Sequence, residues 1–288
     1  MKHFCIFLLY FLCIIAKAQT TYDPIYDGPY GKKIADLAKE ILLEKPQMEY
    51  IYYYICSDPI IDKSKEEYRI LQVGKRYTLF KDYNRYRVDS VLQHFGRDKI
   101  TNKEYKELYW TYPGDSKYVI KDLQESDMWV YDRISPDTYY YQENIPNLHW
   151  KMEEGVRTVC GHTCQKATCT FRGRDWVAWY TMDIPQSQGP WKFGGLPGLI
   201  MQVEDTKREH VFKVVSIRKG SKDCMISRKE SKWYLKTNRE WFLKTQKKME
   251  EDPLGYMQSA GVLKPNPDGT IPKLPKKRLY VFNPIEKE

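Results

Sequence analysis

Two cysteines and a histidine lie close together in the segment Cys160-Gly161-His162-Thr163-Cys164. Thiolate and imidazole groups suit zinc or copper, so these residue types could bind a soft metal ion. In an extended strand, however, Cys160 and Cys164 would be about 13 Å apart at about 3.3 Å per residue. Metal–sulfur distances near about 2.3 Å exclude a shared ion unless the chain turns at Gly161. We therefore assign no metal ligand, and a disulfide to another segment or buried free thiols are the alternatives.

A cysteine–histidine or serine–histidine pair could support acyl transfer if the two side chains met in the fold. His162 and His210 are candidate bases, and Cys169 and Ser187 are candidate nucleophiles. The chain contains no G-x-S-x-G elbow around Ser187 and no H-E-x-x-H motif. A hydrolase is therefore an alternative function, and we predict no catalytic residue and no cofactor.

Arginines and aromatic residues concentrate on a predicted hairpin and on the loop after it, which reads GPWKFGGLPGLI over residues 189–200. Glycine permits positive φ and proline removes an N–H donor, so this loop is expected to turn repeatedly. Its large apolar side chains fit a structural corner folded over the core or the wall of a ligand site.

In the ligand-site hypothesis, aromatic rings stack on an apolar or glycan ligand and arginines hold its anionic end. The arginines could equally pair with Asp175, Asp183 or Asp205, and the rings could fill the core. The candidate ligand-binding residues are Arg172, Arg174, Trp179, Tyr180, Trp191, Phe193, Gly194, Gly195 and Pro197.

The chain resembles the GLPGLI family, secreted proteins of Bacteroidetes named for the hexapeptide that occurs here at residues 195–200. One departure is His162, where the family often has an aromatic residue. The resemblance implies an envelope protein without an established activity, so no catalytic residue is carried over. The matching residues are Glu143, Pro146, Trp150, Gly161, Cys164 to Ala167, Phe171 to Arg174, Ala178 to Thr181, Asp183 to Pro185 and the loop at 189–200, with weaker matches at Leu71 to Lys75 and Asn283 to Glu286.

The first 18 residues are organised like a secretory signal peptide. They contain Lys2, an apolar run from Phe4 to Ile15 and the small-residue pattern Ala16-Lys17-Ala18. We expect cleavage near Ala18 and export to the periplasm, the outer membrane or the cell surface. No segment has the roughly 20 apolar residues of a transmembrane helix. The expected partner is an unknown ligand or an envelope protein, with association with outer-membrane machinery as a further expectation.

The formal net charge of +9 at pH 7 falls to +7 after cleavage, because Lys2 and Lys17 are lost with no acidic residue. Spread positive charge, with clusters at Lys244 to Lys248 and Lys273 to Arg278, is typical of a solvated face. Attraction to an acidic surface or an anionic ligand is the alternative. Nucleic acid is not expected, because an exported chain without a binding motif lacks that signature. The pairing of the five remaining cysteines stays open: Cys56, Cys160, Cys164, Cys169 and Cys224.

Short β-rich segments joined by tight turns predict antiparallel pairing, because parallel strands need long crossovers. One clear hairpin joins Tyr68 to Val73 and Tyr77 to Phe80 through Gly74-Lys75. The other expected strands are Met48 to Cys56, Tyr118 to Lys121, Met128 to Ile134, Tyr139 to Glu143, Trp150 to Val159, Thr163 to Phe171, Trp176 to Asp183, Leu199 to Glu204 and Val211 to Ile217.

Three helices are expected: Gly31 to Lys45, a short one opened by a capping box at Thr101 and Glu104, and Thr237 to Glu250 with a similar box. We predict an α+β fold, a curved antiparallel sheet or partial barrel with an N-terminal and a C-terminal helix packed on it. The expected organisation is a signal peptide at 1–18, one β-rich domain at 19–254 and an irregular tail at 255–288. The predicted function is non-catalytic binding of a ligand or partner protein, and a scaffold or adaptor of an outer-membrane complex is a further alternative.

Overall fold

The structure is a computed structural model that describes residues 25, 26, 28–261 and 281–287, so the predicted signal peptide lies outside the described residues. The chain divides into two compact units. Of the described residues, those up to Asp36 and Phe95–Thr111 form the small unit, and Leu37–His94 and those from Tyr112 onward form the sheet unit. The single domain predicted for residues 19–254 stays a prediction.

The small unit contains helix α3 (Asn102–Thr111). The predicted capping box at its start is confirmed. The backbone N–H of Thr101 donates to the Glu104 carboxylate at 2.8 Å, and the backbone N–H of Glu104 donates to the Thr101 hydroxyl at 3.3 Å. Two of the backbone donors at this end of the helix therefore have acceptors.

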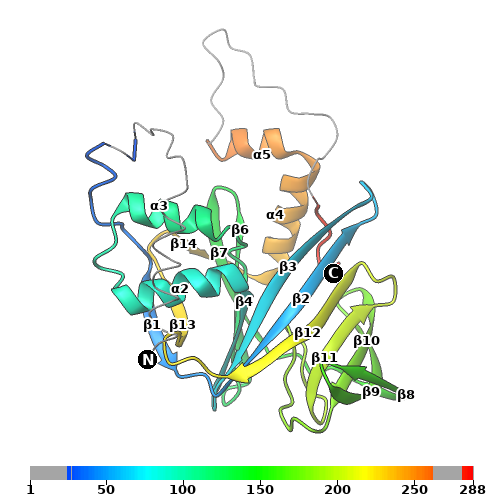
Figure 1. Cartoon of the computed structure of the whole chain (residues 1–288). Helices are drawn as coiled ribbons and strands as arrows, with labels where there is room; N and C mark the ends of the chain where they lie inside the picture. The colour runs from blue at the N-terminus through cyan, green and yellow to red at the C-terminus, as the bar shows by residue number, and fades with distance from the viewer. Residues whose placement is uncertain (1–24, 27, 262–280, 288) are drawn as a thin grey trace. The chain divides into compact units, whose positions relative to one another are not determined.

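A twelve-stranded sheet dominates the sheet unit (Figure 1). Its spatial order is β14-β7-β6-β5-β4-β3-β2-β12-β11-β10-β9-β8, and only β14 runs parallel to its neighbour. The predicted antiparallel sheet is thus confirmed, and its end strands do not pair. The strand bounds are β2 (Met48–Asp58), β3 (Lys63–Val73), β4 (Tyr77–Asp82), β5 (Tyr118–Asp122), β6 (Asp127–Ile134), β7 (Asp137–Asn144), β8 (Lys151–Val159), β9 (His162–Phe171), β10 (Arg174–Thr181), β11 (Leu199–Asp205), β12 (His210–Lys219) and β14 (Tyr234–Lys236).

The loop at residues 189–200 folds inward over the concave side of this sheet. Alternate residues of β10 point to one face, which brings Trp176 against the loop. Phe193 lies 4.7 Å from Trp176 and 5.3 Å from Trp191 between ring centroids, and all three side chains are buried. The loop is therefore part of the hydrophobic core of the sheet unit.

The predicted N-terminal helix from Gly31 to Lys45 is wrong, because Lys39–Glu44 form strand β1. Strand β1 pairs antiparallel with β13 (Ile226–Glu230) in a separate two-stranded sheet. The Glu44 carboxylate also accepts hydrogen bonds from the backbone N–H groups of Lys75 and Arg76, at 3.1 and 3.0 Å. These long-range contacts outweigh the weak helical pattern of apolar residues in this segment.

Helix α2 (Tyr83–Phe95) follows β4 directly, and the sequence analysis did not predict it. The predicted C-terminal helix is confirmed as α4 (Arg239–Glu251). Its cap differs from the prediction, because the Asn238 side chain, rather than Thr237, accepts from the backbone N–H of Trp241 at 2.8 Å. Phe242 packs its ring against Tyr141 on β7, with a centroid distance of 5.8 Å.

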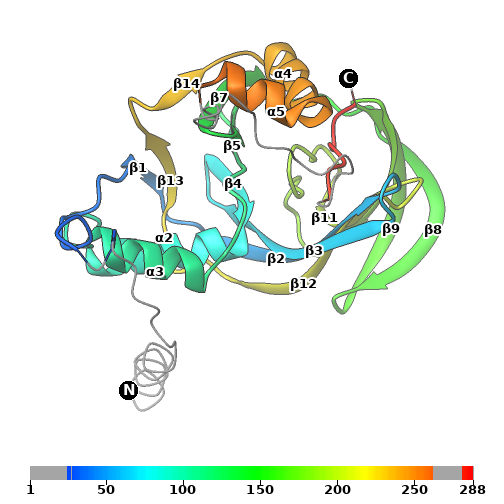
Figure 2. The same cartoon turned by 90° about the horizontal axis from the view of Figure 1, so that it is seen from above.

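The irregular tail predicted for residues 255–288 stays a prediction, because only parts of it belong to the described residues. Pro253–Ser259 form helix α5, and residues 281–287 lie on the concave side of the sheet (Figure 2). The part of the chain between these two segments, residues 262–280, lies outside the described residues. Among the helices that are described, none combines the length and apolar character needed to cross a membrane.

Candidate functional site

The segment 281–287 is held in the concave face by side chains that bind its main chain and by its own polar groups. The backbone N–H of Phe282 donates to Asp58 at 2.9 Å, and the Asn283 amide donates to the Ser57 carbonyl at 2.7 Å. Farther along, the Lys287 N–H donates to the Arg172 carbonyl at 3.0 Å. The sheet therefore binds an extended peptide that belongs to its own chain.

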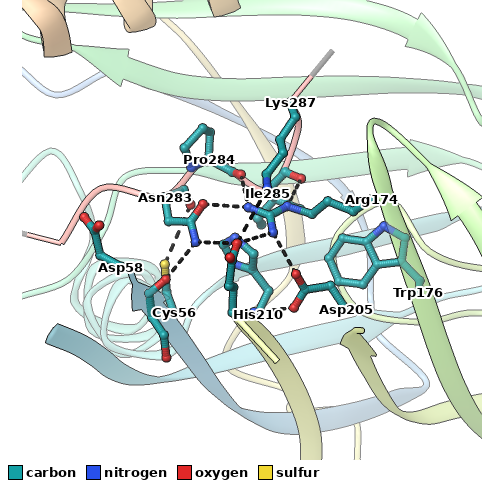
Figure 3. Close-up of polar contacts among 12 residues, drawn as sticks. Cys56, Asp58, Arg174, Trp176, Asp205, His210, Asn283, Pro284, Ile285 and Lys287 are labelled. Atoms are coloured by element: carbon teal, nitrogen blue, oxygen red, sulfur yellow. Dashed lines mark hydrogen bonds and ion pairs between the residues drawn. The ribbon is translucent and has the colours of Figure 1, made fainter. Parts of the chain in front are cut away.

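Arg174 is the central contact of this segment (Figure 3). Its side chain is only 2% exposed and donates five hydrogen bonds, which matches the five N–H groups of a guanidinium. A buried charge of this kind is stable only when it is fully paired. The acceptors are the Ile285 carbonyl at 3.0 Å, the Pro284 carbonyl at 2.9 Å, the Asn283 side chain at 2.6 Å, Asp205 at 2.7 Å and Glu209 at 2.6 Å.

The two carboxylates beside Arg174 are bound from several sides. Burial disfavours ionised Glu209, but hydrogen bonds from Arg174 and Asn283 outweigh it and lower the pKa of Glu209 to about 2. The Asp205 carboxylate also accepts from the backbone N–H of His210 at 2.9 Å. Both acidic groups therefore serve to neutralise Arg174 and to fix the adjoining chain.

His210 is buried beside this cluster. Burial, with the positive charge of Arg174 as a smaller cause, lowers the pKa of His210 to about 3, so its imidazole is neutral near pH 7. Its Nδ1 lies 2.8 Å from the Tyr54 hydroxyl, and its Nε2 has no hydrogen-bond partner among the described residues. Directly across the ladder lies Cys56, whose pKa burial raises. A protonated thiol is a poor nucleophile.

A second ionic cluster joins the glycine-proline loop to the same C-terminal segment. The Lys192 ammonium, fully buried, contacts the carboxylates of Glu143 and Glu286. Arg172 donates to Glu143 at 2.7 Å, and Arg239 on α4 donates to Glu286. Burial opposes ionisation of Glu286, but the Lys192 charge and the bonded donors outweigh it and lower its pKa. These ion pairs therefore connect the glycine-proline loop to β7, α4 and the segment 281–287.

A cavity of about 180 Å³ lies on the concave face beside both clusters. Two ion pairs contribute to its wall, Arg69 to Asp115 at 2.8 Å and Lys117 to Asp132 at 3.2 Å. It is smaller than the roughly 300 Å³ lower end of typical drug-sized sites, so it suits a small molecule or a short side chain. The remaining lining includes the rings of Tyr54, Phe80, Trp191, Phe212 and Phe242 and the segment 281–286.

Only some of the predicted site residues lie together. Arg172 and Arg174 belong to the two ionic clusters, and Trp191 lines the cavity. Of the three aspartates considered as partners for the arginines, Asp205 pairs with Arg174. Phe193 belongs to the hydrophobic core and does not line the cavity.

The other predicted site residues lie apart from this cavity. Trp179 packs under the guanidinium of Arg157, 4.2 Å from its ring centroid, and Tyr180 donates to Gln165 at 2.8 Å. The Gly194 carbonyl accepts from the Trp150 indole at 2.8 Å, whereas Gly195 and Pro197 are exposed.

The residues that sequence reasoning missed are mostly the acidic and amide partners. Glu143 and the segment Asn283 to Glu286 appeared only as positions of the family resemblance, and Glu209 was not singled out. Lys192 was noted only as the ionisable group of the loop. The usable signal was the charge itself, because an arginine or lysine among apolar residues needs a buried partner.

The histidine and cysteine candidates considered in the sequence analysis do not form a common site in the fold. His162 Nδ1 lies 3.1 Å from Asp183, and burial raises the pKa of Cys169 to about 12. All five described cysteines are free thiols, and Cys160 is the exposed one. Within the described ranges, no group of three or more His, Cys, Asp or Glu side chains is arranged to hold a metal ion.

Residues 172–202 match a family described as a protein of unknown function (Porph_ging). The match begins at Arg172 and includes Arg174 and the whole glycine-proline loop, and the GLPGLI assignment itself stays a prediction. A search of curated proteins finds no match.

Among solved structures, the chain is similar to PNGF-II in two crystal forms, described by their P21 and C2 space groups. Sequence identity is 13% and the TM-score is 0.44 in both comparisons. The matches cover 68% and 70% of this chain but 32% and 33% of the PNGF-II chains, so the chain spans about a third of their length.

Proposed function

We propose that the protein is an exported, non-catalytic binding protein of the cell envelope whose ligand or partner occupies the concave face of the sheet unit. The observation that carries this proposal is the cavity beside segment 281–287, where aromatic rings and two ion pairs line one space. Ligand sites commonly combine apolar rings with a few placed polar groups. Export and envelope location come from the signal-peptide pattern and the family resemblance.

Trp191 connects the cavity to the predicted site. Its indole lines the cavity, and its Nε1 donor is buried without a hydrogen-bond partner among the described residues. A buried donor normally has an acceptor. A carbonyl, hydroxyl or carboxylate oxygen of a ligand would supply one at this position.

The test is native mass spectrometry of the mature protein purified from its own envelope, comparing wild type, Trp191→Phe and the control Trp179→Phe. We expect a small-molecule adduct in the wild type that denaturation removes. Trp191→Phe should lose it while Trp179→Phe keeps it, because Trp191 lines the cavity and Trp179 does not. A bare chain in every sample would contradict a bound small molecule, and cross-linking in intact envelopes would then test the partner-protein form of the proposal.

A further inference from the structure

A second cavity of about 430 Å³ lies in the sheet unit, where the two-stranded sheet β1–β13 approaches β6, β7 and β14. It shares no lining residue with the Trp191 cavity, although β6 and β7 contribute different residues to each cavity. The volume falls in the range of about 300–1,000 Å³ that is typical of small-molecule sites. Nothing in the proposed function uses it.

The charge of this second cavity is strongly positive. Four cations line it, Lys39, Arg228, Lys229 and Lys232, against the single carboxylate of Glu230. Arg228 pairs with Glu230 at 2.6 Å, and Lys229 reaches Asp89, outside the lining, at 2.7 Å.

Two of these cations remain uncompensated. Lys39 and Lys232 have no carboxylate partner among the described residues, and Asp89 is itself shared with Lys81 at 3.1 Å. The Nε of Arg228 also has no acceptor within the described part of the chain. A bound anion would neutralise the excess charge and accept from this donor.

Three tyrosines make up most of the remaining lining. Tyr131 and Tyr140 stack with ring centroids 5.5 Å apart, and Tyr234 meets Tyr131 edge-on at 6.1 Å. Outside the lining, Trp129 supports Arg228, whose guanidinium lies 5.7 Å from the centroid of its ring. Stacking on a ring orients a guanidinium for paired recognition of carboxylate or phosphate. Tyrosine rings offer a flat apolar surface with a hydroxyl at its edge, which suits a sugar ring.

We propose that this second cavity binds an anionic saccharide. Its carboxylate or phosphate group accepts hydrogen bonds from Arg228 and is neutralised by the neighbouring lysines. A sugar ring packs against Tyr140 and Tyr234. This site is independent of the one at Trp191, so either proposal can fail alone.

Isothermal titration calorimetry on the mature protein tests the proposal with four probes: digalacturonic acid, glucose 6-phosphate, neutral maltose and inorganic phosphate. We expect at least one acidic sugar to bind at least about tenfold more tightly than maltose or inorganic phosphate. The binding should weaken as ionic strength rises from about 20 to about 200 mM, since salt screens exposed charges. The two acidic probes distinguish a uronic acid from a sugar phosphate as the source of the charge.

Variants locate the binding. Arg228→Gln and Tyr140→Leu should each weaken it about tenfold, because one removes the stacked guanidinium and the other the ring that faces the sugar. Lys213→Gln is the matched control, since it removes one charge from an exposed lysine on β12, and it should bind like the wild type. Thermal unfolding verifies that each variant is folded.

The proposal is overturned by any of three results. The first is that neither acidic sugar binds, and the second is that maltose or inorganic phosphate binds as tightly as the acidic sugars. The third is that folded Arg228→Gln binds like the wild type. Trp191→Phe gives a further separation, because it should alter the adduct of the concave cavity and leave acidic-sugar binding unchanged.

Discussion

The Nε of Arg174 on β10 lies 3.0 Å from the carbonyl oxygen of Ile285, which is 111 residues later in the sequence. The same guanidinium also binds Asp205 (Figure 3) and Glu209. Arg174 thus fastens the end of the described chain to the centre of the sheet and neutralises two buried or half-buried carboxylates. Its removal would take the Arg174 donors away from the peptide carbonyls and from both carboxylates, and Asp205 would keep the contact from the His210 N–H at 2.9 Å.

We expect Arg174→Met to lower the free energy of unfolding by about 3–5 kcal/mol, since breaking a buried ion pair leaves an uncompensated charge. Urea denaturation of the mature protein measures this. Arg208→Gln is the control, because Arg208 is 69% exposed and lies 3.6 Å from Glu204. Removing this exposed ion pair should lower the free energy of unfolding by less than about 1 kcal/mol. Equal losses in the two variants would contradict the central role of Arg174.

The contacts of Arg174 also indicate which segment of the chain should lose protection first when Arg174 is replaced. Hydrogen exchange in Arg174→Lys should speed up at residues 281–287, because a lysine cannot reproduce the planar fork that binds two carbonyls and two carboxylates. Amides in the β2–β3 ladder should be affected much less. Unchanged protection at 281–287 would mean that the other contacts, such as the one from Phe282 to Asp58 at 2.9 Å, hold the segment alone.

Gly198 is the position in the glycine-proline loop where a side chain fits least. A Cβ there would lie 2.0 Å from the Thr181 carbonyl oxygen. Gly198→Ala should therefore force the loop off β10 and lower the free energy of unfolding by several kcal/mol, on the order of a core overpacking or more. Gly161→Ala is the matched control, since a Cβ there meets nothing within 4 Å and only its φ of +81° opposes alanine. Gly161→Ala should lower the free energy of unfolding by about 1–2 kcal/mol. Thermal or urea unfolding gives both values, and a tolerated Gly198→Ala would contradict the close approach.

Most strands could be predicted from the sequence because their signal is local. Alternating aromatic and β-branched residues bounded by turns identified β2 to β12. Strand β1 could not be predicted, because its partner β13 is nearly 200 residues away and the apolar residues of β1 also fit a helix. Helix α2 was missed because its buried positions include Arg85 and Asp89, which interrupt the apolar pattern.

The residues of the candidate site could likewise be predicted only where the signal in the sequence is local. The sequence marked Arg172 and Arg174 on the predicted hairpin and Trp191 in the glycine-proline loop, because arginines and large rings concentrate on these two neighbouring segments. Some of the partners, such as Asn283 and Glu286, come from the far end of the chain, and no local spacing reveals such a contact. The positively charged second cavity depends on the β1–β13 pairing and was equally out of reach.

His210 predicts a loss of stability in acid. Its pKa is about 3 in the folded protein, lowered by burial, against an ordinary value of 6.5. Between these values the unfolded chain binds a proton that the folded one does not, so stability falls as pH decreases from about 6.5 to about 3. His210→Gln should flatten this part of the curve of unfolding free energy against pH, measured by urea denaturation. A slope as steep as in the wild type would show that His210 does not set it.

Lys121 predicts a second pH dependence at the opposite end of the scale. Its side chain is fully buried below the glycine-proline loop, and its ammonium donates to the Phe193 carbonyl at 2.5 Å. Burial lowers the pKa of Lys121 to about 7, against 10.5 for an ordinary lysine. Between these values the unfolded chain binds the proton that the folded chain has released. The free energy of unfolding should therefore receive a contribution that rises with pH from about 7 to about 10.5.

Lys121→Met isolates this contribution, because methionine fills a similar volume without a charge to bury. Urea denaturation between pH 6.5 and 9.5 should show that the stability gained by the variant is largest at the acidic end and shrinks as pH rises. Lys213→Met, at an exposed lysine, should follow the wild-type curve. If the Lys121→Met and wild-type curves run parallel over this range, the buried ammonium keeps its proton and the contact with the Phe193 carbonyl stabilises the charged form.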